Sequence, residues 1–200
     1  MKIGIDVDEV IAEFMDSFLK FYNHKHKTHF RREDFKSYNL WETLGVSKDQ
    51  TTLAANEFYD TDYFRNITPV HGSIYGVYSL NKKMGNEVVI ITARPPEIEN
   101  STISWIKEYF PILSDIYFVH NSAISGDARA STKGDICSRL GIDILIEDNL
   151  TFVNEVRQLS EKTKVLVYEC PWNKGKELPQ GAQFVKSWED IRNYFDRMKF

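Results

Sequence analysis

Two aspartates, Asp6 and Asp8, follow the first apolar run of the chain in the segment IGIDVDEV. Carboxylates this close repel each other strongly in a dry site unless a cation lies between them. Magnesium prefers oxygen ligands in near-octahedral geometry, so the pair predicts a Mg²⁺ site. Taken alone, the two aspartates are at least as typical of a solvated turn after a strand.

Groups that can bind a phosphate occur in two later segments. In VVIITARPP, the hydroxyl of Thr92 and the adjacent backbone at Ala93 can donate hydrogen bonds to phosphate oxygens. In STKGD, Lys133 begins a predicted helix, where a cation is unfavourable for the helix dipole, so an anionic ligand would explain its position. Arg94 is a further phosphate candidate, although a structural ion pair is the preferred interpretation.

Two more carboxylates, Glu147 and Asp148, lie within the segment ILIEDNL, just after the fourth predicted strand. We expect Asp148 to bind the cation, whereas Glu147 either contributes or points away and caps the next helix. All of these segments come after a predicted strand. Because the carboxyl ends of the strands form the ligand crevice of an open parallel sheet, we expect the candidate residues to converge there.

The elements that must position these residues alternate between strands and helices, which predicts an α/β fold with a Rossmann-like, largely parallel sheet. The expected strands are short and apolar, as is typical of strands buried on both faces. They cover Lys2–Val7, Glu87–Ile91, Asp115–Val119, Asp143–Ile146 and Lys164–Tyr168. Helical spacing is found at Ile74–Met84, Ile98–Tyr109, Thr132–Leu140, Thr151–Leu159 and Trp188–Met198.

The interval between the first two strands is too long for a simple crossover, since roughly sixty residues separate Phe14 from Ile74. We expect a small helical cap over residues 15–72, inserted into an α/β core formed by residues 1–14 and 73–200. Most aromatic residues of this region should form the cap's own core, and the others could stack on a base or sugar. Examples of these aromatic residues are Phe14, Phe18, Tyr22, Tyr38, Trp41 and Phe64.

Three histidines, His24, His26 and His29, lie close together in the expected cap and alternate with lysines. A metal site is conceivable, but the neighbouring cations make a solvated helix end the better interpretation.

The ordered set of four motifs resembles the haloacid dehalogenase superfamily. That family carries a DxDx(V/T) motif after its first strand, a Thr or Ser after the second, a Lys before a later helix and an acidic pair after the fourth. The matching positions here are Asp6, Asp8, Val10, Thr92, Lys133, Glu147 and Asp148.

Within that superfamily, the chain looks like the 5'-nucleotidase or deoxyribonucleotidase branch of the cytosolic type C kind. The start DVDEVIAEF is similar to its DVDGVLADF, and PVHGSIYGVYSL, VVIITARP and ECPWN also have counterparts there, the last of these containing Trp172 and Asn173. Two departures are Glu9, which replaces a glycine, and Glu147, which replaces the first aspartate of the pair. Glu9 adds bulk and charge beside the mouth of the site and so affects the expected substrate more than the chemistry.

The resemblance implies a Mg²⁺-dependent phosphomonoester hydrolase that acts on a small phosphate ester, with a nucleoside 5'-monophosphate as the first choice. Asp6 is then the nucleophile, Asp8 the acid and base, and Thr92, Ala93 and Lys133 bind phosphate. The metal ligands are Asp6, Asp8 through its carbonyl oxygen, and Asp148. Alternatives are a phosphatase for another small organic phosphate, a phosphotransferase, or a non-catalytic binding or regulatory domain with this fold.

Composition agrees with a small substrate. With 25 basic and 29 acidic residues, the formal charge is -4, so no uniform positive field favours a nucleic acid polymer. The two cysteines, Cys137 and Cys170, lack zinc-binding spacing and suit reduced thiols in a cytoplasm. The N-terminal residues MKIGIDVDEV match neither a signal peptide nor a membrane span. The sequence does not indicate an oligomeric state.

Overall fold

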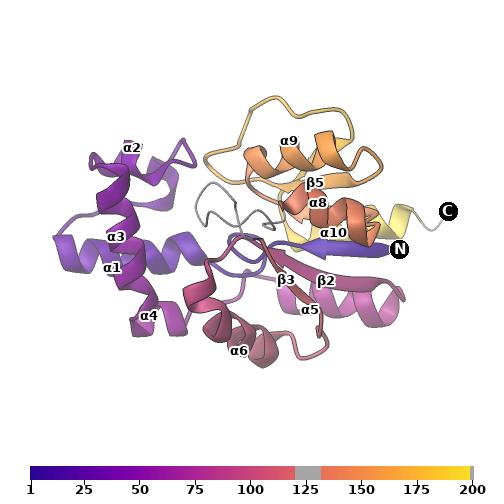
Figure 1. Cartoon of the computed structure of the whole chain (residues 1–200), viewed down its shortest axis with the longest axis horizontal. Coiled ribbons are helices and arrows are strands. Elements are labelled where there is room, and N and C mark those ends of the chain that lie inside the picture. Colours follow the sequence, from indigo (N-terminus) through magenta and orange to yellow (C-terminus); the bar gives the residue numbers. More distant parts are fainter. Residues whose placement is uncertain (120–131, 199–200) are drawn as a thin grey trace.

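A computed structural model describes residues 1–119 and 132–198 of the chain. In this part, the strands form a six-stranded parallel sheet in the order β3-β2-β1-β4-β5-β6 (Figure 1). The strands are β1 (Lys2–Ile5), β2 (Glu87–Thr92), β3 (Ile116–Phe118), β4 (Ile144–Glu147), β5 (Lys164–Tyr168) and β6 (Ala182–Val185). The parallel α/β prediction is confirmed.

Strand β6 was not expected from the sequence. Its segment AQFV lies at the edge of the sheet, and only its last residue, Val185, is buried. Such a strand lacks the continuous apolar run that a strand covered on both faces shows.

The helices of the core occupy both faces of the sheet. They are α5 (Ser73–Tyr78), α6 (Glu99–Tyr109), α8 (Lys133–Leu140), α9 (Leu150–Leu159) and α10 (Trp188–Arg197), with the short η3 (Pro96–Ile98) preceding α6. The single helix expected over Ile74–Met84 is instead α5 followed by a π-helical turn, η2 (Ser79–Lys83).

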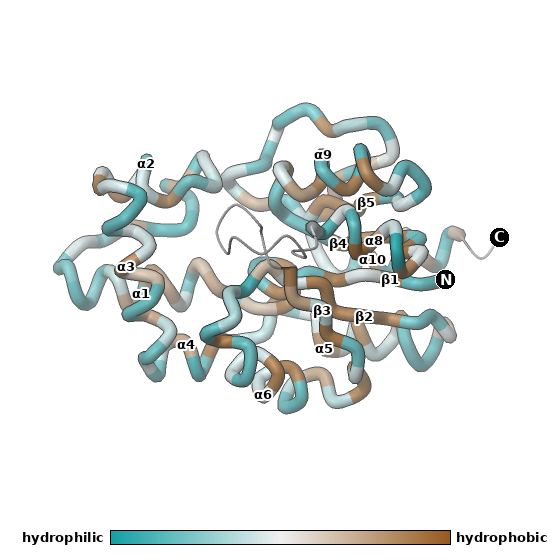
Figure 2. Tube along the Cα trace, in the orientation of Figure 1, coloured by the Kyte–Doolittle hydropathy of each residue, from teal (hydrophilic) through white to brown (hydrophobic). Residues whose placement is uncertain are grey.

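Alternate residues of the strands enter two separate hydrophobic clusters, and Figure 2 shows β2 and β3 as largely hydrophobic segments of the trace. Ile90 packs in one cluster with residues of α5, α6 and α10, whereas Ile91 packs in the other with residues of α8 and α9. This alternation follows from the two-residue period of a strand. The central strands are therefore buried on both faces, and their carboxyl ends are held rigidly.

Trp188 of α10 binds the loop after β1 to the core. The indole nitrogen of Trp188 donates a hydrogen bond of 2.8 Å to the carbonyl oxygen of Val10. The same ring lies against Gly76 of α5, where an added Cβ would stand 2.2 Å from Cε3 of the ring. Only glycine permits this close approach, so the loop that carries Asp8 has a fixed support.

The region between β1 and α5 is helical and lies beside the sheet, at the left of Figure 1. It contains α1 (Phe14–His26), η1 (Arg32–Asp34), α2 (Leu40–Leu44), α3 (Lys48–Tyr59) and α4 (Asp62–Arg65). We refer to residues 15–72 as the insert. His24, His26 and His29 are exposed, which agrees with the solvated helix end expected for them.

The insert has an aromatic core around Phe58 of α3. The ring centroids of Phe14, Phe18 and Phe64 lie 5.4, 5.6 and 5.5 Å from that of Phe58, and all three pairs are edge-on. Phe18, Tyr22 and Phe64 are thus buried by the insert's own packing, as expected from the sequence.

In the part of the chain that the structure describes, no helix is both long enough and apolar enough to cross a membrane.

We expect Phe58→Ala to lower the free energy of unfolding by about 3–5 kcal/mol, because it removes the ring at the centre of this aromatic cluster. Urea denaturation followed by circular dichroism measures the change. Leu53→Ala is the matched control, because Leu53 lies on the same helix and is 60% exposed. A loss no larger than that of the control would show that this cluster does not stabilise the insert.

Candidate active site

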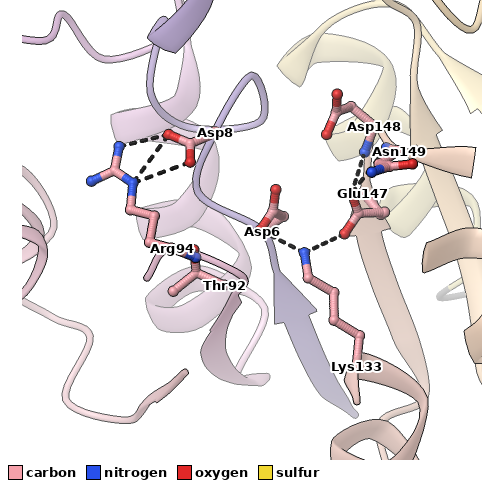
Figure 3. A network of polar contacts seen from close by, with 8 residues as sticks. All are labelled: Asp6, Asp8, Thr92, Arg94, Lys133, Glu147, Asp148 and Asn149. Atoms are coloured by element: carbon pink, nitrogen blue, oxygen red, sulfur yellow. Dashed lines mark hydrogen bonds and ion pairs between the residues drawn. The ribbon is translucent and has the colours of Figure 1, made fainter. Parts of the chain in front are cut away.

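Lys133 lies among acidic side chains at the carboxyl edge of the sheet (Figure 3). Its ammonium nitrogen is 2.7 Å from Oδ1 of Asp6, directly after β1, and 2.5 Å from Oε2 of Glu147, at the end of β4. The Lys133 side chain is fully buried and its ammonium lies 4.6 Å from the centroid of the Phe152 ring. Residues far apart in sequence therefore converge where the strand order predicts.

Local structure at the start of α8 explains the position of Lys133. Thr132 caps this helix: its hydroxyl accepts a hydrogen bond from the Asp135 amide, and the Asp135 carboxylate accepts one from the Thr132 amide. This capping box fixes the first turn of α8. Lys133, the first residue of that helix, is thereby directed into the buried acidic cluster.

Glu147 faces Lys133 and also accepts hydrogen bonds from the turn that follows it. Its Oε1 accepts hydrogen bonds from the amides of Asp148 and Asn149, at 3.1 and 2.9 Å. Asn149 in turn is the N-cap of α9 and accepts a hydrogen bond from the Thr151 amide. The carboxylate of Glu147 is thus held at both oxygens.

Asp148 is held by the loop that follows β5. The indole nitrogen of Trp172 donates a 2.9 Å hydrogen bond to Oδ2 of Asp148, and the side-chain amide of Asn173 donates a 2.7 Å bond to its carbonyl oxygen. Both loop residues are buried. The sequence left the role of Trp172 and Asn173 open between contact with the site and simple burial, and the structure combines the two.

Asp8 does not face Asp6 directly but points towards Arg94 (Figure 3). The Arg94 guanidinium donates hydrogen bonds to Oδ1 of Asp8, at 2.6 Å from Nη2 and 3.1 Å from Nε, and also to the Thr102 hydroxyl. The structural ion pair preferred for Arg94 is therefore present, and its partner is the candidate acid–base. Thr92 is fully buried, its hydroxyl accepting a bond from the Arg94 amide.

Ala93, the remaining predicted phosphate-binding position, is exposed directly after Thr92 at the end of β2.

The acidic cluster fits a divalent cation. Asp6, Glu147 and Asp148 each offer a carboxylate oxygen, and these atoms lie within 4.8 Å of one another. It is the one group of this kind found among residues 1–119 and 132–198. Three buried carboxylates and one ammonium carry a formal charge of about -2, which a single Mg²⁺ would balance. The predicted contribution of Asp8 is its carbonyl oxygen, and its side chain is not part of the group.

Burial dominates the electrostatics of this cluster. Burial raises the pKa of Asp6 to about 7, although Lys133 opposes the shift, and the nearby Glu147 and Asp8 add to it. Burial also raises the pKa of Asp148 well above its ordinary value, with Glu147 and Asp6 as further causes. For Lys133, burial alone would lower the pKa, but the carboxylates of Asp6 and Glu147 outweigh it and raise the pKa.

A cavity of about 110 Å³ adjoins the cluster and is lined by Asp8, Asp148, Tyr38 and Trp172, among others. Tyr38 also lines a larger groove, of about 760 Å³, between the insert and the segment after β2. The Tyr38 side chain is 52% exposed as a whole. A substrate bound at the cluster could therefore extend into the groove.

This fold is that of haloacid dehalogenase-type hydrolases. A HAD family hydrolase from Deinococcus radiodurans, solved with bound phosphate and sodium, is similar with a TM-score of 0.64 at 14% identity, over 99% of this chain and 96% of that one. The Bacillus subtilis protein YfnB, solved with bound magnesium, gives a TM-score of 0.63 at 11% identity over 98% of each chain.

Sequence comparison identifies the family within this class. Residues 1–199 match the model of the family "5' nucleotidase, deoxy (Pyrimidine), cytosolic type C protein", and the chain belongs to that family. It is thus a hydrolase of the phosphoric monoester class with the haloacid dehalogenase fold.

Two relatives have names that agree with this assignment. A Bacillus cereus protein named "Putative nucleotidase" is 27% identical over 122 residues, which are 59% of this chain and 64% of that protein, slightly less than two thirds of its length. A Staphylococcus epidermidis protein named "Putative 5'(3')-deoxyribonucleotidase" is 22% identical over 99% of this chain and 97% of that protein.

We expect Lys133→Met to lower the free energy of unfolding by about 3–5 kcal/mol, because it leaves buried carboxylates without their cationic partner. Urea denaturation in the absence of divalent metal measures this loss. Lys174→Met is the control, since Lys174 is 71% exposed and lies 3.8 Å from Glu169. Equal stability of the two variants would contradict the importance of the buried pair.

The raised pKa of Asp6 predicts that Mg²⁺ affinity increases with pH. Because Asp6 titrates at about 7 without metal, Mg²⁺ must displace a proton below that pH. The folded metal-free protein favours the protonated carboxyl, so its stability declines as the pH rises from about 4 to about 7. Added Mg²⁺ should therefore raise the melting temperature more at pH 8 than at pH 5, with K⁺ at matched ionic strength as control. An equal rise at both values would contradict this prediction.

Proposed function

We propose that this protein is a Mg²⁺-dependent phosphomonoester hydrolase that forms an aspartyl-phosphate on Asp6 and acts on nucleoside 5'-monophosphates. The observation that supports this most directly is the buried group of Asp6, Glu147 and Asp148 around Lys133, at the strand ends of a haloacid dehalogenase fold. Such a group has the charge and the oxygen ligands for a divalent cation beside a carboxylate nucleophile.

Asp6, Asp148 and the carbonyl oxygen of Asp8 are the proposed ligands of the cation. When bound, Mg²⁺ screens the repulsion between a carboxylate and a phosphate and neutralises charge that develops during the transfer. Lys133, at the same edge, can contact an equatorial phosphate oxygen. Thr92 is proposed as a second contact, and its burial at the end of β2 gives it a fixed position.

The reaction proceeds in two steps. An oxygen of Asp6 attacks phosphorus, the bond from phosphorus to the leaving oxygen breaks, and Asp8 gives that oxygen its proton. Asp8 then takes a proton from water, whose oxygen attacks the aspartyl-phosphate, so that inorganic phosphate leaves and Asp6 is regenerated. Asp8 lines the cavity beside Asp148, and the leaving group is proposed to depart on that side.

The insert is proposed to act as a cap domain that selects the leaving group, with residues 1–14 and 73–200 as the core domain. The groove of about 760 Å³ is lined by aromatic side chains including Tyr38, Trp41 and Tyr59, together with Asn56 and Thr52. Flat aromatic surfaces with amide and hydroxyl groups suit a base and a sugar. The family assignment favours a nucleotide over another small organic phosphate.

A non-catalytic role is less well supported, because a domain that has lost its chemistry should have lost an essential carboxylate. Asp6, Asp8 and Asp148 are all present, and Asp6 and Asp148 lie in the cluster. Release of phosphate without an added acceptor would argue against a phosphotransferase. We place the protein in the cytoplasm, in keeping with two cysteines that are free and buried.

Replacement of Asp6 by Asn should reduce phosphate release by about 10³-fold or more, because the amide is a poor nucleophile while its shape is retained. Phosphate release from a panel of nucleoside monophosphates and sugar phosphates with Mg²⁺ measures it, and excess chelator should abolish the wild-type rate. Asp49→Asn, on the outer helix α3, is the matched control and should keep the full rate. Full activity of Asp6→Asn would refute the mechanism, and equal slow rates on every ester would refute nucleotide selectivity.

A further inference from the structure

Glu9 adopts a strained backbone conformation, and the contacts of its side chain must offset this strain. Its φ is 64°, in the left-handed region where glycine is favoured, yet the residue is a glutamate and only 6% exposed. Both carboxylate oxygens are engaged: Oε1 accepts a 2.6 Å hydrogen bond from the Met15 amide, and Oε2 lies 2.6 Å from the Arg32 guanidinium. A strained backbone held by two strong contacts indicates a specific use for this carboxylate.

Arg32 connects the insert to two separate loops of the core. It begins η1 in the insert, pairs with Glu9 in the loop after β1, and lies 5.5 Å from the centroid of the Trp172 ring in the loop after β5. Its Nη2 also donates to the sulfur of Cys170, two residues before Trp172, at 3.3 Å. A planar guanidinium is suited to pairing with a carboxylate while it stacks on an aromatic face.

Trp172 extends this set of contacts to the acidic cluster, because its indole nitrogen donates to Oδ2 of Asp148 at 2.9 Å. The path therefore runs from Glu9 through Arg32 and Trp172 to Asp148. One end of the path, Asp148, is a proposed ligand of the cation. The other end, Glu9, is adjacent in sequence to Asp8, whose carbonyl oxygen is a proposed ligand. Hydrogen bonds of this kind fix the orientation of metal-binding carboxylates in other proteins.

We propose that Glu9 and Arg32 are positioning residues for the cation site. Their ion pair holds the insert against the core, keeps the Trp172 ring in place, and so directs one oxygen of Asp148 to the indole and leaves the other free for the cation. This inference rests on the proposed Mg²⁺ site, but it concerns affinity for the metal and not turnover. Because coupling between two events is reciprocal, Mg²⁺ should also strengthen the docking of the insert.

Isothermal titration of the full chain with Mg²⁺ alone tests the inference. Glu9→Gln keeps an acceptor for the Met15 amide and removes the charge that pairs with Arg32, Arg32→Met removes the guanidinium, and Trp172→Phe removes the indole N–H. Each variant should weaken Mg²⁺ binding by about tenfold. The double variant Glu9→Gln with Trp172→Phe should weaken it by less than the product of the single effects, because both act through one path.

Glu57→Gln is the matched control, since it breaks another glutamate pair, with Lys25, and neither residue lines the cavity or the groove beside the cluster. It should leave the Mg²⁺ dissociation constant unchanged. If Glu9→Gln or Arg32→Met lowers the melting temperature but binds Mg²⁺ like the wild type, the pair is only structural and the inference is overturned. Should Glu9→Gln fail to fold, Arg32→Met decides the question by the same criterion.

The outcomes also separate this inference from the proposed function. A wild type that binds Mg²⁺ but releases no phosphate from any ester would refute the proposed hydrolase, while the titrations would still test the positioning path. Unchanged Mg²⁺ affinity in the variants, together with an inactive Asp6→Asn protein, would refute the positioning path and leave the hydrolase in place.

Discussion

The structure depends on burying three carboxylates close together, away from water. Asp6, Glu147 and Asp148 are buried within reach of a single cation, and the Lys133 ammonium offsets only part of their charge. Burying carboxylates is costly unless they have partners, and here each of the three is held by a hydrogen bond or an ion pair. The Glu147 oxygens take two amides and Lys133, and the Trp172 indole holds Asp148.

Sheet register explains why the cluster forms at all. Ile5 of β1 pairs with Ile146 of β4, so the residues that follow, Asp6 and Glu147, emerge side by side, and the Asp6 amide donates to the Ile146 carbonyl. Parallel order is what makes this convergence predictable, since every carboxyl end falls on one edge. The apolar runs of the sequence were therefore enough to bring together Asp6, Lys133 and Asp148, and to predict the fold class.

Contacts between side chains on different elements could not be predicted from the apolar runs of the sequence. Arg94 and Asp8 are 86 positions apart, and Trp172 and Asp148 are 24 apart, so no local period connects either pair. Arg94 was expected to form an ion pair, but its partner could not be chosen among many carboxylates. Glu9 stood out only as a departure from the family pattern, and its pairing with Arg32 depends on how the insert folds back. The short strand β6 and the π-helical turn of η2 were missed because neither has a distinctive pattern of apolar residues.

The loop after β1 carries two acidic residues, one of which contacts the core and the other the insert. Asp8 and Glu9 are neighbours, yet each pairs with a different arginine: Asp8 with Arg94 from the core and Glu9 with Arg32 from the insert. Arg94 also lies 5.2 Å from the centroid of the Phe64 ring, which belongs to the aromatic core of the insert. The insert therefore supplies one of these two arginines and contacts the other. Any shift of its helices relative to the sheet must alter the surroundings of Asp8 as well as the groove beside it, because packed cores transmit displacements and do not absorb them. In the proposed mechanism, selection of a leaving group and placement of the candidate acid–base thus depend on the same few contacts.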